Sequence, residues 1–297
     1  MNTEHLAPIE GTAMSIDFQQ RERKALDLSD KVVVVVGAGQ QAGPGMGNGR
    51  AISILAARHG AEVVAVDRNV AAARETVDLI TAEGGRAYAV EANVAERADC
   101  ERIFDQTMTT SGRVDGMVYS VATNPPFDLA TNTMTVENFN YGVNVNMLGC
   151  YHCNLFAAQC MEKNSGDTTG SIVNISSIAS IKNELGLNIG IMPYALGKCG
   201  LNQITELTAV QYAGAGIRVN TLMLGPIDSV LGNHDSQSLF GFDAGQVEDA
   251  YSEVVKLKMG RASVWESAYA AVYLLADESR FMTGQQIRLD GGATLVR

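Results

Sequence analysis

The chain has 297 residues, of which 46% are hydrophobic and 19% charged, and its formal net charge is -11. This acidic balance excludes a surface built for nucleic acid or anionic membranes, because such partners require clustered Lys and Arg. No apolar run reaches membrane-spanning length, and the N-terminus lacks the apolar core of a signal peptide. We expect a cytoplasmic protein whose partner is a small molecule, with neither a nucleic-acid nor a membrane partner.

Residues 1–30 show little periodicity and are interpreted as an N-terminal extension. No Pro/Ser-rich linker or charge run interrupts the middle of the chain, so residues 31–297 are expected to form one domain. The segment 226–259 is the longest stretch between predicted sheet elements, and a connection of that size indicates a substrate lid. A helix is predicted within it, over 246–258.

Short apolar runs predict the strands, and the first of them is an uninterrupted valine run of the kind found in buried parallel strands. The predicted strands are 31–36, 62–66, 87–91, 116–120, 171–175, 218–223 and 286–289. Helix-length segments separate them, at 47–59, 70–83, 95–111, 135–163, 193–213 and 264–277. This alternation predicts an α/β fold with a doubly wound, Rossmann-like parallel sheet of about seven strands and helices on both faces.

The cysteines are interpreted as buried apolar filler, because they offer no second Cys/His pair at metal-ligand spacing. No metal site is expected. In the reducing cytoplasm a disulfide is not expected either. The five cysteines are Cys100, Cys150, Cys153, Cys160 and Cys199.

A glycine-rich turn follows the first predicted strand and precedes a predicted helix, which is the context of a dinucleotide-binding turn. Glycines let the backbone approach a pyrophosphate, and the helix N-terminus offers unpaired N–H groups to it. The second strand ends at Asp67, whose carboxylate suits the adenosine ribose hydroxyls and repels a 2′-phosphate. NAD is therefore preferred, while Arg68 keeps an NADP-dependent ketoreductase as an alternative, because an arginine there can pair with that phosphate.

Tyr194 and Lys198 are four residues apart in a segment that Pro193 marks as the start of a helix. Their side chains therefore share one helix face, where the lysine cation favours the tyrosine phenolate. A phenol with an ordinary pKa of about 10 can then exchange a proton near neutral pH, as alcohol oxidation requires. The pair alone favours an ordinary surface pair, because a Tyr and a Lys at this spacing occur by chance in many helices.

Taken together, these features resemble the short-chain dehydrogenase/reductase family from about Asp30 to about Thr294. Gly47-Asn48-Gly49 stands where the family has Gly-Ile-Gly, and Asn93-Val94 resembles its adenine-binding dipeptide. The resemblance extends to Val145-Asn146-Met147-Leu148-Gly149, Gly170 to Ser177, Arg218-Val219-Asn220, Gly225-Pro226-Ile227-Asp228-Ser229, Thr283-Gly284-Gln285 and Asp290-Gly291-Gly292.

The resemblance implies a catalytic set of Asn146, Ser177, Tyr194 and Lys198. In it Tyr194 exchanges the substrate proton, Ser177 hydrogen bonds to the substrate oxygen, and Asn146 orders a water that connects Lys198 to solvent. Ser176 is the alternative to Ser177. The turn and the resemblance together give as cofactor-binding residues Gly37, Gly39, Gly47, Asn48, Asp67, Arg68, Asn93, Val94, Ser120, Ala122, Tyr194, Lys198, Gly225, Ile227 and Ser229.

The chain departs from the family pattern in four places. The glycine turn is longer and begins after Val36 where a Thr is usual, so which glycine contacts phosphate stays open. Tyr119-Ser120-Val121-Ala122 replaces Asn-Asn-Ala-Gly, which removes amides that stabilise the central sheet. The loop 181–192 is longer than usual, and Leu224 replaces a proline.

We expect the protein to interconvert a secondary alcohol and a ketone, with a bulky, mainly apolar or cyclic substrate. The alternative is a non-catalytic nucleotide-sensing protein, although such a relative lacks the Ser/Tyr/Lys set. The resemblance implies a homo-oligomer, a tetramer, formed through the helices near 135–163 and 193–213. The residues expected to make the pocket apolar are Leu185, Leu187, Ile191, Met192, Leu231, His234, Leu239, Phe240 and Phe242.

Overall fold

The structure is a computed structural model and describes residues 24–43, 45–126, 133–181, 191–233 and 243–295. Its centre is a seven-stranded sheet with strand order β3-β2-β1-β4-β5-β6-β9, in which every neighbouring pair is parallel. The prediction of a doubly wound, Rossmann-like α/β fold is therefore confirmed. The strands are β1 (Val32–Val36), β2 (Glu62–Asp67), β3 (Arg86–Glu91), β4 (Gly116–Tyr119), β5 (Gly170–Ser177), β6 (Ile217–Leu224) and β9 (Gln286–Leu289).

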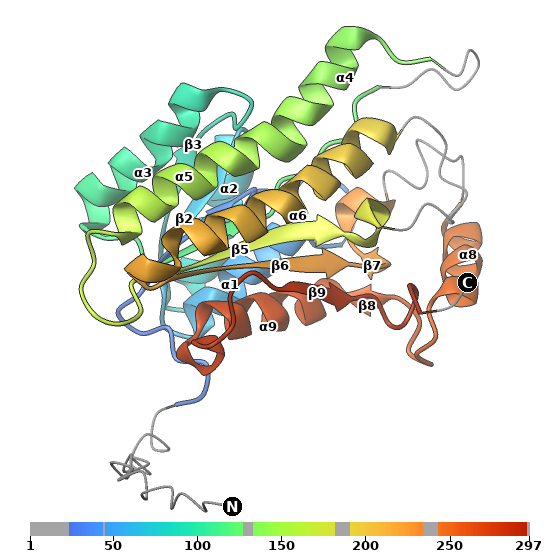
Figure 1. Cartoon of the computed structure of the whole chain (residues 1–297). Helices are drawn as coiled ribbons and strands as arrows, with labels where there is room; N and C mark the ends of the chain where they lie inside the picture. Colours follow the sequence, from blue (N-terminus) through green and yellow to red (C-terminus); the bar gives the residue numbers. More distant parts are fainter. Residues whose placement is uncertain (1–23, 44, 127–132, 182–190, 234–242, 296–297) are drawn as a thin grey trace, which may run out of the picture.

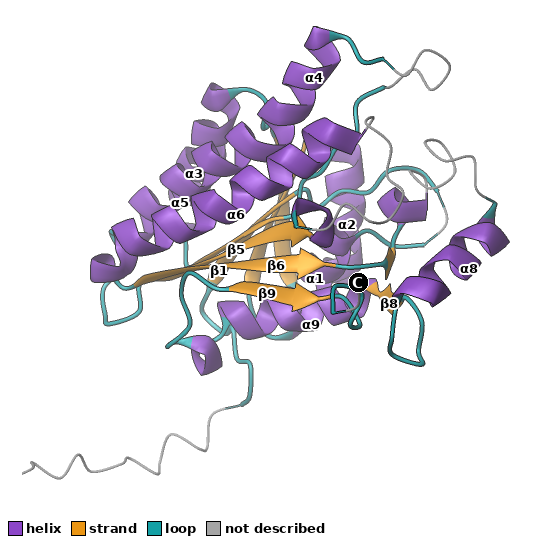
Figure 2. Ribbon diagram, turned by 45° about the vertical axis from the view of Figure 1, so that its right-hand side comes forward, coloured by secondary structure: helices purple, strands orange, loops and turns teal. Residues whose placement is uncertain are grey.

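Helices cover both faces of this sheet (Figure 1). One face carries α1 (Asn48–Arg58), α2 (Val70–Ala82) and α9 (Val264–Leu275), and the other carries α3 (Arg97–Ser111), α5 (Gly149–Met161) and α6 (Met192–Tyr212). Helix α8 (Ala244–Val254) and the short strands β7 (Ile227–Asp228) and β8 (Ala262–Ser263) lie beyond the carboxyl ends of β5 and β6 (Figure 2).

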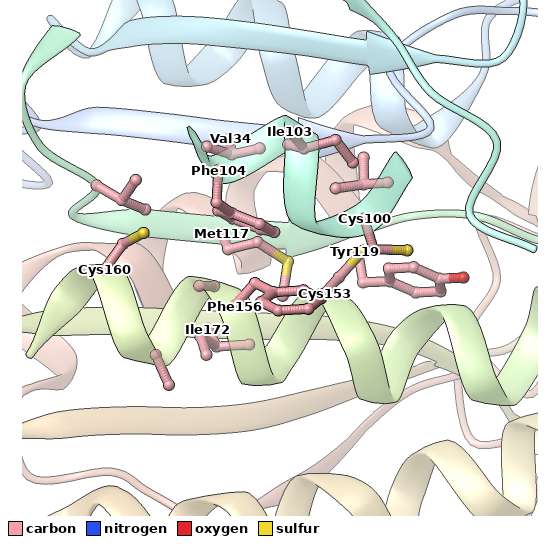
Figure 3. Close-up of a cluster of buried hydrophobic side chains, with 14 of the residues drawn as sticks. Val34, Cys100, Ile103, Phe104, Met117, Tyr119, Cys153, Phe156, Cys160 and Ile172 are labelled. Atoms are coloured by element: carbon pink, nitrogen blue, oxygen red, sulfur yellow. The ribbon is translucent and has the colours of Figure 1, made fainter. Parts of the chain in front are cut away.

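The valine run of β1 explains why the sheet is buried on both faces. Val33 and Val35 pack in the core under α1 and α9, whereas Val34 packs in the core under α3 and α5. Figure 3 shows the second of these cores, where Phe104 lies next to Val34 and Phe156 lies near Met117. Burial of each valine side chain contributes about 1.5–3 kcal/mol to the free energy of folding. The central strands therefore hold the loops at their ends in fixed positions.

The single helix predicted over 135–163 is wrong in its middle. The structure has α4 (Val136–Val143), a π-helical segment at Asn144–Leu148, and then α5. The buried Tyr119 hydroxyl donates to the Val145 carbonyl at 2.5 Å. Burial raises the pKa of Tyr119 well above its usual value, so the phenol stays protonated and able to donate. Tyr119 thus stabilises the segment where a π turn interrupts the helix.

Cys100, Cys150, Cys153 and Cys160 are buried, as predicted, and Figure 3 shows three of them in the core between α3 and α5. The same prediction is wrong for Cys199, which is exposed, because its position on α6 faces outward next to the inward-facing Lys198. Within the described ranges, no group of three His, Cys, Asp or Glu side chains could hold a metal ion.

The other differences concern element ends. The helix predicted over 246–258 begins earlier, at Ala244, because Asp243 and Gln246 form a capping box. It ends at Val254, since Val255 is extended. Among the residues that the structure describes, no helix combines the length and the apolarity that a membrane span needs.

Candidate functional site

A cavity of about 460 Å³ lies at the carboxyl ends of the strands, where ligands bind in open parallel sheets. The glycine turn after β1 lines one side of it, and the ends of β5 and β6 line the other. Every predicted site residue lines this cavity except Asn146, which lies behind its wall. The topology therefore brings together residues that are widely separated in the sequence.

The glycine turn packs so closely that it excludes side chains. Gly37 has a φ of +86°, and a Cβ there would lie 2.8 Å from the Ser120 carbonyl oxygen. A Cβ on Gly49 would lie 1.9 Å from the Gly37 oxygen, and one on Gly39 would lie 2.7 Å from the Asp67 carboxylate. These contacts bring the N-terminus of α1 against the turn, where helical N–H groups lack intrahelical partners.

Gln40 braces the lengthened part of this turn. Its Nε2 donates to the Gly45 carbonyl at 3.2 Å, and its Oε1 accepts from the Gly47 N–H at 3.1 Å. The turn also reaches across the cavity, because the Val230 N–H donates to the Met46 carbonyl at 3.3 Å. The sequence prediction missed Gln40 and Val230, since neither belongs to a recognisable pattern.

Asp67 and Arg68 have different environments at the end of β2. The Asp67 carboxylate accepts from the N–H groups of Gly39 at 3.0 Å and Asn69 at 2.9 Å, which fixes it at the edge of the turn. The Arg68 guanidinium donates to the Tyr141 hydroxyl on α4 at 2.7 Å. Both Arg68 and Tyr141 line the cavity, and Tyr141 was not predicted.

Tyr194 and Lys198 lie in the first two turns of α6, which has Pro193 at its start as predicted. Lys198 is 2% exposed, and its Nζ donates to the Val121 carbonyl at 3.0 Å and the Ile175 carbonyl at 2.7 Å. Burial lowers the pKa of Lys198 from 10.5 to about 8. The Nζ lies 5.7 Å from the centre of the Tyr194 ring, so both side chains face one cavity from one side of the helix.

Ser177 and Ser176 end β5 in different surroundings. Both serines line the cavity. The Ser177 Oγ accepts from the Ala179 N–H at 3.1 Å, so its own hydrogen is available to another acceptor. Ser176 is 2% exposed, and its hydroxyl donates to the Lys198 carbonyl at 3.3 Å. The geometry therefore favours Ser177 over Ser176 as the group that meets a ligand.

Asn146 is fully buried in the π-helical segment. Its Oδ1 accepts from the Thr123 N–H at 2.9 Å, and its Nδ2 donates to the Thr123 carbonyl at 2.8 Å. The side-chain amide therefore fixes the strand end that also presents the Val121 carbonyl to Lys198. A glycine at 197 permits this contact, since a Cβ there would lie 2.4 Å from the Asn146 Cβ.

Side chains from the start of α6, from the segment after β7 and from α8 also line the cavity. Ile191 and Leu231 line it as predicted, together with Tyr251 of α8, which was not predicted. Met192 does not line it and is 39% exposed, because helix geometry turns it away from Tyr194. The other predicted pocket residues lie outside the described residues: Leu185, Leu187, His234, Leu239, Phe240 and Phe242.

Comparisons with known proteins agree with this geometry. Residues 43–294 match a family model described as Enoyl-(Acyl carrier protein) reductase, adh_short_C2. The chain is 30% identical to 2,5-dichloro-2,5-cyclohexadiene-1,4-diol dehydrogenase of Sphingobium indicum, over 91% of this chain and 99% of that protein. It is also 30% identical to cyclohexanol dehydrogenase of an Acinetobacter species, over 90% and 96% respectively.

A solved structure of 7α-hydroxysteroid dehydrogenase complexed with NADH and 7-oxo glycochenodeoxycholic acid is 26% identical to this chain. Its TM-score is 0.77, and the match covers 90% of this chain and 95% of that one.

Proposed function

The chain belongs to the short-chain dehydrogenase/reductase family, whose members include dehydrogenases of alcohols, and on that premise we propose an NAD(H)-dependent oxidoreductase that interconverts a secondary alcohol and a ketone. One observation carries the proposal. Ser177, Tyr194 and Lys198 line the same cavity as the glycine turn and Asp67. A substrate carbon can therefore meet both a proton-transfer group and a nicotinamide in one enclosed space.

The residues around the glycine turn fit a dinucleotide. The turn has room for backbone but not for side chains at Gly37 and Gly49, which is the cradle that a pyrophosphate requires. Asn93 and Val94 would border the adenine, and Gly225, Ile227 and Ser229 the nicotinamide carboxamide. When bound, the nicotinamide supplies the hydride acceptor or donor.

In the proposed oxidation, the Tyr194 phenolate accepts the proton of the substrate hydroxyl. In reduction, the Tyr194 phenol donates its proton to the ketone oxygen. Ser177 donates a hydrogen bond to the same oxygen and stabilises the charge that develops on it. The Lys198 cation, held by the carbonyls of Val121 and Ile175, favours the phenolate form of Tyr194.

We assign Asn146 a supporting role in this mechanism. Its amide is engaged with both backbone groups of Thr123, which favours holding the strand end over direct contact with a ligand. Asn146 remains part of the proposed set because the Lys198 partner Val121 depends on this strand end.

We propose NAD over NADP because of Asp67 and Arg68. The carboxylate is fixed by two N–H groups beside the turn, where it can accept from ribose hydroxyls and repel a 2′-phosphate. The guanidinium that could bind this phosphate is hydrogen bonded to Tyr141 instead. The NADH complex of the related hydroxysteroid dehydrogenase supports the same choice.

A bulky, mainly apolar or cyclic alcohol is the proposed substrate class. Ile191, Leu231 and Tyr251 line the same cavity as Tyr194, and the segment 226–259 that supplies two of them is the proposed substrate lid. The relatives named for a cyclohexadiene diol and for cyclohexanol act on cyclic alcohols. Among the described lining residues, Arg68 is the one arginine, and it lies at the opposite end of the cavity from Tyr194. We therefore do not propose a substrate whose carboxylate binds an arginine near Tyr194.

A homo-oligomer, a tetramer, is proposed through the outer faces of α5 and α6. These helices expose the large apolar side chains of Tyr151, Leu207 and Val210, and the π-helical segment just before α5 exposes Leu148. Exposed apolar groups in such number are typical of subunit interfaces. Light scattering of the purified protein measures the mass, and a monomer would contradict this assignment.

The experiment for the proposed function incubates the protein with NAD, and separately NADP, and a panel of cyclic and open-chain secondary alcohols. The absorbance of the reduced cofactor reports turnover. We expect reduction of NAD with cyclic alcohols and oxidation of NADH with their ketones. A protein that binds NADH, detected by cofactor fluorescence, but turns over no alcohol or ketone would instead be a nucleotide-sensing binding protein.

A further inference from the structure

The row of side chains that starts with Tyr194 and Lys198 on α6 has a third member, Asn202. The three residues are spaced by four along the helix and therefore share one face. Asn202 is 5% exposed and does not line the cavity. It cannot touch a substrate directly, so its polar group serves another part of the protein.

Two hydrogen bonds lead from Asn202 to Ser177. The Asn202 Nδ2 donates to the Ser180 Oγ at 2.9 Å. The Ser180 hydroxyl in turn donates to the backbone carbonyl of Ser177 at 2.6 Å. The helix that carries Tyr194 is thereby linked to the serine on the neighbouring strand.

This link acts where the sheet no longer holds the chain. Ser177 is the last residue of β5, and a single 3₁₀ turn at Ile178–Ser180 follows it. That turn also supplies Ile178 and Ala179 to the cavity wall. Its orientation depends on a few bonds only, of which the Ser180 hydroxyl makes one and the Ser177 Oγ, accepting from Ala179, makes another.

We infer that Asn202 is a positioning residue that holds the Ser177 hydroxyl at a fixed distance from the Tyr194 hydroxyl. This inference rests on the proposed function. Because Tyr194, Lys198 and Asn202 belong to one rigid helix, the link through Ser180 sets the distance between the groups that would contact one substrate oxygen. A displacement of about 1 Å at such a group can reduce turnover about a hundredfold.

The test compares Asn202→Ala, Ser180→Ala and the double variant with the wild-type protein. We expect each single variant to lower kcat about tenfold or more and to leave the dissociation constant of NADH unchanged. The double variant should lose no more than either single variant, because both act through one link. Asn202→Asp, which keeps the shape but replaces the donor by acceptors, should resemble Asn202→Ala.

Gln203→Ala is the matched control, since Gln203 is an exposed amide on the same helix. It should leave kcat unchanged. Additive losses in the double variant, or a weaker binding of NADH in step with the loss of kcat, would indicate only a general structural role. Wild-type kcat in Asn202→Ala would overturn the inference while leaving the proposed function intact.

A second readout does not depend on turnover. The Ala179 N–H donates to the Ser177 Oγ, and the Ile181 N–H donates to the Ile178 carbonyl at 3.0 Å. Hydrogen exchange of these amides should be faster in Asn202→Ala and Ser180→Ala but not in Gln203→Ala. Unchanged exchange in Asn202→Ala and Ser180→Ala would overturn the inference, whether or not the wild-type protein oxidises an alcohol. Absence of turnover in the wild-type protein would count against the proposed function alone.

Discussion

The Nζ atom of Lys198 lies 5.7 Å from the centre of the Tyr194 ring and hydrogen bonds to the carbonyls of Val121 and Ile175. Lys198 thus acts on Tyr194 through its charge and not through a direct hydrogen bond to the ring. The two carbonyls come from the ends of β4 and β5, so the charge is held in place by the central sheet. The protonation state of Lys198 therefore depends on the position of these two carbonyls in the folded protein.

Tyr194→Phe should reduce turnover by at least about a hundredfold, since general acid–base transfer contributes about 10²–10⁴-fold. Binding of NADH, measured by fluorescence, should remain close to wild type, because the ring and the neighbouring Lys198 are retained. Tyr269→Phe, at a 56% exposed site on α9, is the matched control and should have full activity. Turnover retained in Tyr194→Phe would remove Tyr194 from the proposed set.

Lys198 should make stability depend on pH. Its pKa is lowered from 10.5 to about 8 in the folded protein, so the folded state binds fewer protons than the unfolded state between these values. The penalty for burying the charge is complete below pH 8 and disappears as the pH rises toward 10.5. At about 1.4 kcal/mol per pH unit, the change is on the order of 3 kcal/mol.

The measurement is urea unfolding of the wild type and Lys198→Met between pH 7 and pH 10. The other titrating groups contribute equally to both proteins, so their effect cancels in the difference between the two free energies of unfolding. The two carbonyls that Lys198→Met leaves unpaired destabilise the variant by the same amount at every pH. The free energy of unfolding of the wild type should rise relative to the variant above pH 8. A difference that is flat across this range would contradict the buried-lysine assignment.

The positions of the strands along the chain could be predicted from the sequence because parallel strands buried on both faces require continuous apolar runs, such as 32–36. The pairing of Tyr194 with Lys198 was equally predictable, since it depends only on helical spacing. Both features follow from local sequence, and the structure has them as predicted.

Other parts of the site depend on contacts between distant segments. The π-helical segment at Asn144–Leu148 is stabilised by the phenol of Tyr119, which lies 26 residues before its partner Val145 in the sequence. The bond of Arg68 to Tyr141 spans 73 residues. No periodicity reports such pairs, so Tyr141 and Gln40 could be found only from coordinates.

Asp67→Asn should shift cofactor preference toward NADP. The variant keeps an acceptor oxygen for only one of the N–H groups of Gly39 and Asn69, and it removes the charge that opposes a 2′-phosphate. The ratio of kcat/KM for NADP to that for NAD should rise about tenfold. Adding Tyr141→Phe, which releases Arg68, should raise it further.

Asp105→Asn controls for the change in net charge, because Asp105 is exposed on α3, away from the cavity. It should leave the ratio unchanged. A ratio that stays constant in Asp67→Asn would mean that this carboxylate does not select the cofactor.

Tyr119→Phe should lower the free energy of unfolding by about 1–3 kcal/mol, because it leaves the buried Val145 carbonyl without its donor. Tyr88→Phe removes a half-buried hydroxyl that bonds to Ser111 at 3.1 Å, where water can replace it, and should cost less. Urea denaturation measures both. Equal losses would show that the Tyr119 bond has no special weight in the π-helical segment.

Gly197→Ala should impair both stability and turnover. The added Cβ would lie 2.4 Å from the Asn146 Cβ, so α6 must move away from the π-helical segment. Overpacking of this kind costs about 1–3 kcal/mol, and the same movement displaces Tyr194 and Lys198 from the strand ends. Gly214→Ala is the matched control, since a Cβ there meets no atom within 4 Å.

Unfolding and turnover are measured for both variants under identical conditions. If Gly197→Ala matched Gly214→Ala in turnover while losing stability, the spacing between α6 and Asn146 would serve folding alone. If it lost turnover with little loss of stability, the close approach at Gly197 would serve to keep Lys198 within reach of the Val121 and Ile175 carbonyls. The contact between α6 and the π-helical segment would then determine the catalytic rate.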